Sequence, residues 1–398
     1  MTAPRIPIMR PIMGEPEWRA VKEVIESGWV TQGPKVAEFE HAMATLCGTR
    51  HAVALSSCTT ALHLALVCAG VGAGDEVVVP SMSYIATANV VVHAGGRPVF
   101  AEVEPDTFNL DLEDVRRRIT PRTKAILLVH QLGLPAHIEA FHALGDKHGL
   151  TIIEDAACAI GSRYRGRPIG GHSEMVAFSF HPRKVVTTGD GGMITTDSDA
   201  HAERLRLLRH HGMSVADTVR HGSTRVMREE YNEVGYNYRM TDIQAAVGIE
   251  QLKRLAEMVE RRQLVARRYD AALAGHDRIS TPRVPEGVEW NVQSYAVRLR
   301  GFDAEKRDAV MQLLLDNGIA SRPGVMVAHR EPAYARKQPI QLPVSEAASD
   351  CSLILPLYHD LTEKEQSEVV DELRRAVDAI GKGLIPSAPS RDGKGGSC

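Results

Sequence analysis

From residue 52 to residue 154 the chain alternates short β-branched runs with helical stretches, and this alternation limits the fold more than any other feature. The expected strands are residues 52–55, 76–79, 97–101, 124–129 and 151–154, and the expected helices are residues 60–69, 85–93, 112–119 and 138–148. The strands are nearly continuous apolar runs, which is typical of burial on both faces. Repeated strand–helix units predict an α/β fold with a mostly parallel central sheet flanked by helices. Ligands bind such sheets at the carboxyl ends of the strands.

The order of elements changes after this region. Two further strands are expected at residues 175–180 and 192–196, and the glycine-rich loop 189–192 between them suggests a hairpin insert rather than another strand–helix unit. The polar stretch 212–237 has little periodicity, so we expect a long loop there, and loops of that length are usually functional.

The last part of the chain predicts a second, smaller α+β domain. An amphipathic stretch at 241–273 is expected to bridge the two domains. It is followed by an expected strand at 294–299 and helices at 304–316 and 362–380.

Charge and cysteine content narrow the class of protein. The 398 residues carry 47 basic and 50 acidic side chains, a net charge of −3, so no general field favours nucleic acid or an anionic membrane. The six cysteines form no C-x-x-C pair, and the start has no apolar core of signal-peptide length. We therefore expect reduced thiols in a soluble, cytoplasmic protein.

Several common catalytic motifs are absent from the sequence. It contains no P-loop, no H-E-x-x-H, no G-x-S-x-G and no G-x-G-x-x-G, which excludes the usual nucleotide-hydrolase, zinc-protease, hydrolase and dinucleotide-binding interpretations. The 17 histidines lack ligand spacing with carboxylates or cysteines, so no metal site is expected.

Two polar segments stand directly after expected strands. Ser57-Cys58-Thr59-Thr60 begins a helix, where free backbone N–H groups suit a phosphate, although an ordinary N-cap explains these residues about equally well. The acid pair Glu154-Asp155 ends a buried strand at the sheet's carboxyl edge. It is either a strand-terminal turn or the source of a carboxylate that pairs with a protonated ring nitrogen.

The third segment contains Lys184, between the strand at 175–180 and the glycine loop. Partial burial and nearby cations would make its amine more nucleophilic, whereas a surface lysine is the ordinary alternative. Taken together, a phosphate cradle, a carboxylate for a pyridinium nitrogen and a Schiff-base lysine are the parts that a pyridoxal 5′-phosphate (PLP) site needs.

The order and spacing of these segments resemble the DegT/StrS family of sugar aminotransferases, PLP enzymes of fold type I. The resemblance runs from about Met13 to about Leu373. It is carried by these motifs: Ser27-Gly28-Trp29-Val30-Thr31-Gln32-Gly33-Pro34, Thr59-Thr60-Ala61-Leu62-His63-Leu64-Ala65-Leu66, Gly74-Asp75-Glu76-Val77, Tyr84-Ile85-Ala86-Thr87-Ala88-Asn89, Glu154-Asp155-Ala156-Ala157, Phe178-Ser179-Phe180 with Lys184, and Gly235-Tyr236-Asn237-Tyr238-Arg239-Met240.

The resemblance implies a role for each matching position. Lys184 would hold the cofactor as a Schiff base, and Asp155 would pair with the pyridine nitrogen. Tyr84 would stack on the ring. Asn237 would reach the phosphate from the other subunit, because such enzymes build each site across a homodimer interface. Phosphate contacts within the subunit would come from Thr59, Thr60 and Ser179.

The resemblance also implies the domain organisation. Residues 1–30 would form an N-terminal segment that contributes to the active-site region. Residues 31–255 would form the large PLP-binding domain, with its mostly parallel sheet, and residues 256–385 the small C-terminal domain. The Gly/Ser/Pro-rich tail, 386–398, is expected to be disordered.

The sequence departs from the family pattern at three positions. Cys158 stands where the family usually has a glutamine or histidine that contacts the ring hydroxyl, Cys58 replaces a frequent glycine, and Asp190 a frequent glutamate. The lysine is retained, which disfavours the branch in which histidine replaces it and sugars are deoxygenated.

The resemblance therefore implies a PLP-dependent aminotransferase of aminosugar biosynthesis. It would transfer an amino group from glutamate or glutamine to the keto group of a nucleotide-linked deoxysugar, with pyridoxamine 5′-phosphate (PMP) carrying the amino group between the two half-reactions. A cyclitol (inosose-type) ketone is the alternative acceptor. A non-catalytic PLP-binding regulator is the alternative of another class, against which intact Lys184 and Asp155 argue, as does the lack of a DNA-binding module.

Overall fold

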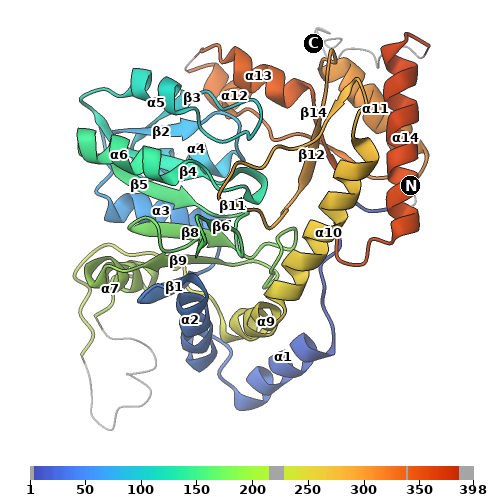
Figure 1. Cartoon of the computed structure of the whole chain (residues 1–398). Coiled ribbons are helices and arrows are strands. Elements are labelled where there is room, and N and C mark those ends of the chain that lie inside the picture. The colour runs from blue at the N-terminus through green and yellow to red at the C-terminus, as the bar shows by residue number, and fades with distance from the viewer. Residues whose placement is uncertain (1–3, 215–227, 338, 385–398) are drawn as a thin grey trace, which may run out of the picture.

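The computed structural model describes residues 4–214, 228–337 and 339–384 (Figure 1). The expected disordered tail, 386–398, and the middle of the expected loop 212–237 lie outside the described residues. The strands are β1 His51–Leu55, β2 Glu76–Pro80, β3 Arg97–Ala101, β4 Thr123–Val129, β5 Thr151–Asp155, β6 Arg163–Tyr164, β7 Arg167–Pro168, β8 Met175–Ser179, β9 Gly192–Thr196, β10 Ile279–Ser280, β11 Val288–Glu289, β12 Tyr295–Leu299, β13 Arg322–Pro323 and β14 Ser352–Leu355.

The helices surround these strands. They are α1 Glu15–Ser27, α2 Pro34–Cys47, α3 Cys58–Cys68, α4 Ala86–His93, α5 Leu112–Arg118, α6 Ile138–His148, α7 Asp199–Arg209, α9 Asp242–Lys253, α10 Leu255–Leu273, α11 Ala304–Asp316, α12 Pro332–Ala335, α13 Pro343–Asp350 and α14 Glu363–Gly381, with 3₁₀ turns at Gln131–Gly133 and Ala328–Arg330.

The central sheet has seven strands in the order β1-β9-β8-β5-β4-β2-β3. Neighbours from β8 through β5, β4 and β2 to β3 pair in parallel, whereas β9 runs antiparallel to both β8 and β1. The prediction of a mostly parallel sheet with a hairpin insert after residue 175 is therefore confirmed. Because only β9 is reversed, the carboxyl ends of β1, β8, β5 and β2 meet at one edge.

The strands bury both of their faces, as their apolar runs predict. Along β4, Ile126 and Leu128 belong to one core, with side chains from α2, α5, α6 and α9. Ala125 and Leu127 belong to the core on the opposite face, with side chains from α3, α4 and α7. Figure 1 shows these helix layers on either side of the sheet.

The amphipathic stretch 241–273 differs from the prediction, because it consists of two helices that meet at Arg254. Thr241 caps the first, α9, by accepting a hydrogen bond from the backbone of Gln244 at 3.2 Å. The second, α10, contributes Met258 to a core of the central sheet and Tyr269 to a separate core near the C-terminus. The expected bridge is thus made by α10.

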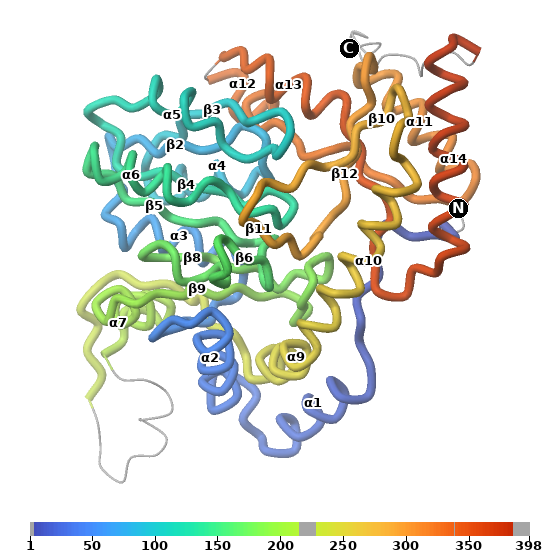
Figure 2. Tube along the Cα trace, viewed as in Figure 1, coloured from blue at the N-terminus to red at the C-terminus, as the bar shows by residue number. Residues whose placement is uncertain are grey.

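A third apolar core forms around the C-terminal elements. A four-stranded sheet of order β10-β12-β14-β13 packs there with side chains from α10, α11 and α14. A small sheet of order β11-β6-β7 lies between this core and the central sheet (Figure 2). The domain boundary at residues 255 and 256 stays a prediction.

The described residues carry neither a membrane-spanning helix nor a cluster of metal ligands. None of the helices in this part of the chain has the length and apolar character needed to cross a membrane. Within the same ranges, no group of three or more His, Cys, Asp or Glu side chains could hold a metal ion.

Candidate active site

The polar segments singled out in the sequence lie at the carboxyl edge of the central sheet. β5 ends at Asp155, β8 ends at Ser179, and the segment beginning at Ser57 follows β1. β8 and β5 are neighbours in the sheet. This edge is where a parallel sheet binds its ligand.

The first segment forms the N-terminus of α3. Ser57 accepts a hydrogen bond from the backbone of Thr60 at 3.1 Å, and the Thr60 hydroxyl donates to the carbonyl of Ser57 at 2.7 Å. The N-cap interpretation is therefore confirmed, and the helix presents the partial positive charge that suits an anion. β9 approaches this turn so closely that a Cβ on Gly192 would lie 2.3 Å from the Ser57 carbonyl.

Asp155 is buried, with 5% of its surface exposed, and it ends the strand β5. Its carboxylate accepts hydrogen bonds from the backbone of Ala157 at 3.1 Å and from the Thr87 hydroxyl at 3.2 Å. Burial raises the pKa of Asp155, while these bonds and nearby Lys184 act to lower it. A carboxylate so held favours a cationic partner, as a protonated ring nitrogen would be.

Lys184 follows β8 and is partly buried. Its Nζ donates a hydrogen bond to the sulfur of Cys158 at 3.0 Å. Burial acts first to lower the pKa of Lys184, but Cys158, Cys58 and Asp155 together hold it above its ordinary value. We expected burial and nearby cations to make this amine more nucleophilic, which requires a lowered pKa. That expectation is wrong, because the protein's own groups raise the pKa of Lys184. Arg10 and Arg262 line a cavity beside Lys184, but the groups that raise its pKa are two thiols and a carboxylate.

Cys58 is a second thiol in the same cluster, and sequence analysis gave it no role. It is the first residue of α3 and is buried. Burial raises the pKa of Cys58 well above its usual range, and nearby Asp155 raises it further. Burial therefore disfavours the thiolate form of Cys58, which is the reactive one.

We expect Cys158→Ser to keep most of the turnover, because transamination needs no thiolate and serine can still accept the Lys184 hydrogen bond. Cys158→Gln should bind PLP at least as tightly as the unchanged protein, since it restores a stronger donor for the ring oxygen. Turnover and PLP affinity are measured for both variants, with Cys68→Ser, on α3, as the control. A loss of several orders of magnitude in Cys158→Ser, with PLP still bound, would show that the thiol has a chemical role.

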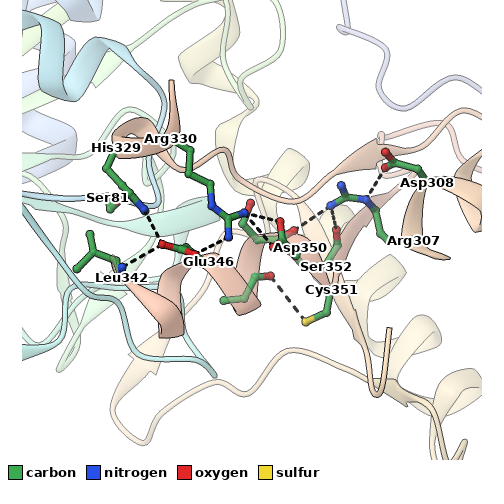
Figure 3. A network of polar contacts seen from close by, with 12 residues as sticks. Ser81, Arg307, Asp308, His329, Arg330, Leu342, Glu346, Asp350, Cys351 and Ser352 are labelled. Carbon is green, nitrogen blue, oxygen red and sulfur yellow. Dashed lines mark hydrogen bonds and ion pairs between the residues drawn. The ribbon is translucent and has the colours of Figure 1, made fainter. Parts of the chain in front are cut away.

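Tyr84 lies in a turn that follows β2, and 67% of its surface is exposed. The turn begins at Ser81, whose carbonyl accepts a hydrogen bond from Ala328 at 2.8 Å and whose hydroxyl contacts His329. The other ring nitrogen of His329 lies 2.9 Å from Glu346, as Figure 3 shows. Elements near the C-terminus therefore support the turn that carries Tyr84.

The structure gives Ser179 and Asn237 fewer contacts with the cluster. Ser179 is buried at the end of β8, and its hydroxyl accepts a long hydrogen bond of 3.4 Å from the backbone of His181. Asn237 forms a β-bridge with His210, and its neighbour Tyr238 accepts a hydrogen bond from Ser56 at 2.8 Å. The segment of Asn237 thus lies beside the start of α3, but no contact joins Asn237 to Lys184.

Thr87 is a residue of the site that sequence analysis did not single out. It is buried in α4, and its hydroxyl links Asp155 to Ser83, 2.8 Å away. It belongs to the motif Tyr84-Ile85-Ala86-Thr87-Ala88-Asn89, in which the resemblance gave a role to Tyr84 but none to Thr87. The pairing of a hydroxyl with a residue 68 positions later needed the fold to be seen.

The residues present fit PLP. A buried carboxylate, a lysine amine and a helix N-terminus meet at one sheet edge, and they match the cofactor's ring nitrogen, aldehyde and phosphate. A small cavity beside Lys184 is also lined by Arg10, Arg262 and His359.

Comparisons with solved structures give close matches over nearly the full chain. The sugar aminotransferase CalS13 from Micromonospora echinospora is 31% identical, with a TM-score of 0.85, over 93% of this chain and 99% of that chain. The aminotransferase TlmJ from Streptoalloteichus hindustanus is 35% identical, with a TM-score of 0.87, over 94% and 99%. Spr1654 from Streptococcus pneumoniae, in its PLP form, is 30% identical, with a TM-score of 0.88, over 94% and 99%.

The family model of the DegT/DnrJ/EryC1/StrS aminotransferases matches residues 11–374, almost the whole chain. The fold agrees, because the sheet and its helix layers match those of the aminotransferase structures. The same Streptococcus pneumoniae protein has been solved in a PMP form as well as a PLP form, which are the two states of an aminotransferase cofactor. The chain therefore belongs to the DegT/DnrJ/EryC1/StrS aminotransferase family and is a PLP-dependent enzyme.

Proposed function

We propose that this enzyme transfers an amino group from glutamate or glutamine to the keto group of a nucleotide-linked deoxysugar. The observation that carries the proposal is the Lys184–Asp155 cluster, within a chain that matches CalS13, a sugar aminotransferase, over 93% of its length. When bound, PLP supplies a carbonyl that takes up the amino group and a ring that accepts electrons from the carbon losing a proton.

The proposal assigns the cofactor to residues at the carboxyl edge of the sheet. Lys184 would hold it covalently, Asp155 would keep the ring nitrogen protonated, and Tyr84 would cover one face of the ring. The side chain of Cys158 would lie beside the ring hydroxyl. Phosphate ligands would be Thr59, Thr60 and Ser179, with Asn237 of a second subunit.

Lys184 also performs the proton transfers in this proposal. Its Nζ would take a proton from the α-carbon of the donor and deliver it to C4′ of the cofactor, and the reverse transfer would serve the acceptor. The contacts from Cys158 and Asp155 raise the pKa of Lys184 and so favour its protonated form. This form is the one that donates the proton in the second transfer. Asp155 would act by its charge alone.

The donor and acceptor can be identified in two assays. Glutamate and glutamine are first mixed separately with the PLP-loaded enzyme, and conversion of the cofactor's absorbance to that of PMP is followed. Nucleotide keto-sugars and inososes are then offered to the PMP-loaded enzyme, and the products are identified by mass. Amination of a nucleotide keto-sugar supports the proposal, and exclusive use of inososes would replace it with the cyclitol alternative. Failure of both donors would favour a non-catalytic regulator.

We further propose that the enzyme is a cytoplasmic homodimer with shared sites. The described cysteines, Cys47, Cys58, Cys68, Cys158 and Cys351, are free thiols, which suits a reducing compartment. Asn237 lies in a segment beside the start of α3 and has no contact with Lys184 of its own chain. Supply of Asn237 by a partner would complete the phosphate site.

Mixing two inactive variants, Lys184→Ala and Asn237→Asp, should restore activity if sites are shared. The aspartate is chosen because its charge repels phosphate. Random pairing gives one fully wild-type site in each hybrid, so about a quarter of the wild-type activity is expected. Native mass spectrometry confirms that hybrids are present, and hybrids without activity would contradict site sharing.

A further inference from the structure

One side chain from the segment between β11 and β12 holds the backbone on both sides of Lys184. The side-chain oxygen of Gln293 accepts a hydrogen bond from the backbone of Val185 at 3.0 Å. Its side-chain nitrogen donates to the carbonyl of Arg183 at 2.6 Å. Gln293 is buried, and it is 110 residues from Arg183 in the sequence. The two partners fix which end of its amide is the oxygen, because one donates and the other accepts.

Asn291, two residues earlier, holds the backbone of Cys158 in the same way. Its side-chain nitrogen donates to the carbonyls of Cys158 and Ile160, both at 2.8 Å. Its side-chain oxygen accepts from the backbone of Gln293 at 3.0 Å, which links Asn291 to the chain that carries Gln293. Asn291 is completely buried, so its hydrogen bonds are made without competition from water.

The residue between these two amides has an unfavourable backbone conformation. Val292 has a φ of 52°, in the left-handed region that β-branched residues rarely adopt. The Arg262 guanidinium donates to the carbonyls of Val292 at 3.2 Å and of Gln293 at 3.4 Å. Burial lowers the pKa of Arg262 to about 10, and no carboxylate among the described residues contributes to that shift. The buried Arg262 guanidinium thus binds two backbone carbonyls of this segment. Backbone strain of this kind persists where surrounding contacts impose it.

The two anchored backbones carry the side chains that meet at the centre of the site. Lys184 and Cys158 come from different loops, yet their nitrogen and sulfur lie 3.0 Å apart. A lysine side chain has several rotatable bonds, so the position of its amine depends on how firmly its backbone is fixed. Residues 290–293 run from β11, beside β6, to β12, and Figure 2 shows this trace passing between the C-terminal sheet and the loops of the central sheet.

We propose that Gln293 and Asn291 are positioning residues that set the place of Lys184 relative to Cys158 and the cofactor. The proposal rests on the proposed role of Lys184 and adds the means by which the chain holds that lysine. An amide is required at residue 293, because a carboxylate cannot donate to the Arg183 carbonyl and an apolar side chain satisfies neither partner. Gln293 itself acts only through the lysine.

The test compares Gln293→Met with Gln263→Met. Gln263 is a matched control, because its side chain donates to the carbonyl of Trp290 at 2.9 Å in the same segment without contacting the residues beside Lys184. Three quantities are measured: the rate at which added PLP becomes linked to Lys184, trapped by borohydride; PLP affinity; and kcat and KM for the donor half-reaction. Circular dichroism checks that each variant is folded.

We expect Gln293→Met to slow covalent linkage and to lower kcat by about 10–100-fold, with the donor KM nearly unchanged. Gln263→Met should leave all three quantities close to wild type. The same Gln293 substitution made in Lys184→Ala should not change PLP affinity, because the residue acts through the lysine. Wild-type linkage rates in Gln293→Met, or an equal loss of PLP affinity with and without Lys184, would overturn the proposal.

A variant that fails to fold is replaced by Gln293→Glu, which is nearly isosteric, keeps an acceptor for Val185 and turns the donor to the Arg183 carbonyl into an acceptor. The linkage readout needs no acceptor and no turnover. Failure of the proposed transamination in the wild-type enzyme is therefore distinguishable from failure of this inference.

Discussion

Lys184→Ala is expected to abolish transamination while leaving the fold and the PLP site in place. The substitution removes the amine whose nitrogen lies 3.0 Å from the sulfur of Cys158. No other described lysine contacts the cluster of Lys184, Cys158 and Asp155. Loss of a proton-transferring group at the reacting carbon should lower kcat by about 10⁴-fold. Stopped-flow absorbance of the PLP-loaded variant with glutamate measures the loss, and gel filtration followed by phosphate analysis measures retained PLP.

Lys147→Ala is the matched control for this variant. Lys147 lies in the last turn of α6 and is exposed, so its removal should leave activity unchanged. Residual activity in Lys184→Ala that matches this control would refute the assignment of the lysine. A small residual rate that rises on adding a free primary amine would instead support it, because the amine replaces the missing base.

Asp155→Asn is expected to have the second largest effect. The substitution keeps the shape of the side chain and removes the buried charge. The amide oxygen of asparagine can still accept from the backbone of Ala157, and its NH2 group can donate to the Thr87 hydroxyl. Without that negative charge the protonated form of the ring nitrogen is no longer stabilised. We therefore expect kcat to fall by about 10³-fold, which corresponds to about 4 kcal/mol of transition-state stabilisation. Single-turnover kinetics with glutamate measure the chemical step directly.

Two comparisons separate an electrostatic effect from a structural one. Asp111→Asn alters a carboxylate that caps α5 and should leave both stability and kcat nearly unchanged, because asparagine caps a helix about as well as aspartate. Asp155→Asn should retain its fold, because it replaces a buried carboxylate, whose pKa is raised by burial, with a neutral amide. A rate close to wild type in Asp155→Asn would contradict the role of this carboxylate.

Local patterns were sufficient to predict much of this molecule. The apolar runs at residues 52–55, 151–154 and 175–180 identified buried strands, and their parallel order placed the polar segments after them at one edge. The glycine-rich loop before β9 predicted the hairpin. The structure shows that Gly192 has no room for a side chain, because β9 passes close to the backbone of Ser57. The polar segments were visible because they follow strands directly.

Contacts between distant parts of the chain could not be predicted in this way. Gln293 reaches Arg183 across 110 residues, and Thr87 reaches Asp155 across 68, so neither leaves a local pattern. The break at Arg254 was missed because the apolar periodicity continues through it. The raised pKa of Lys184 was not predicted either, because Cys158 and Cys58, which contribute to it, are distant from Lys184 in the sequence.

The central claim is that Lys184 carries the cofactor, and one measurement tests it most directly. The PLP-loaded enzyme is reduced with borohydride and digested, and the modified peptide is located by mass spectrometry. We expect the protein to be yellow before reduction and, after reduction, to carry a single phosphopyridoxyl group on Lys184, in the peptide that follows β8. A label on any other lysine, or no label while PLP remains bound, would contradict it.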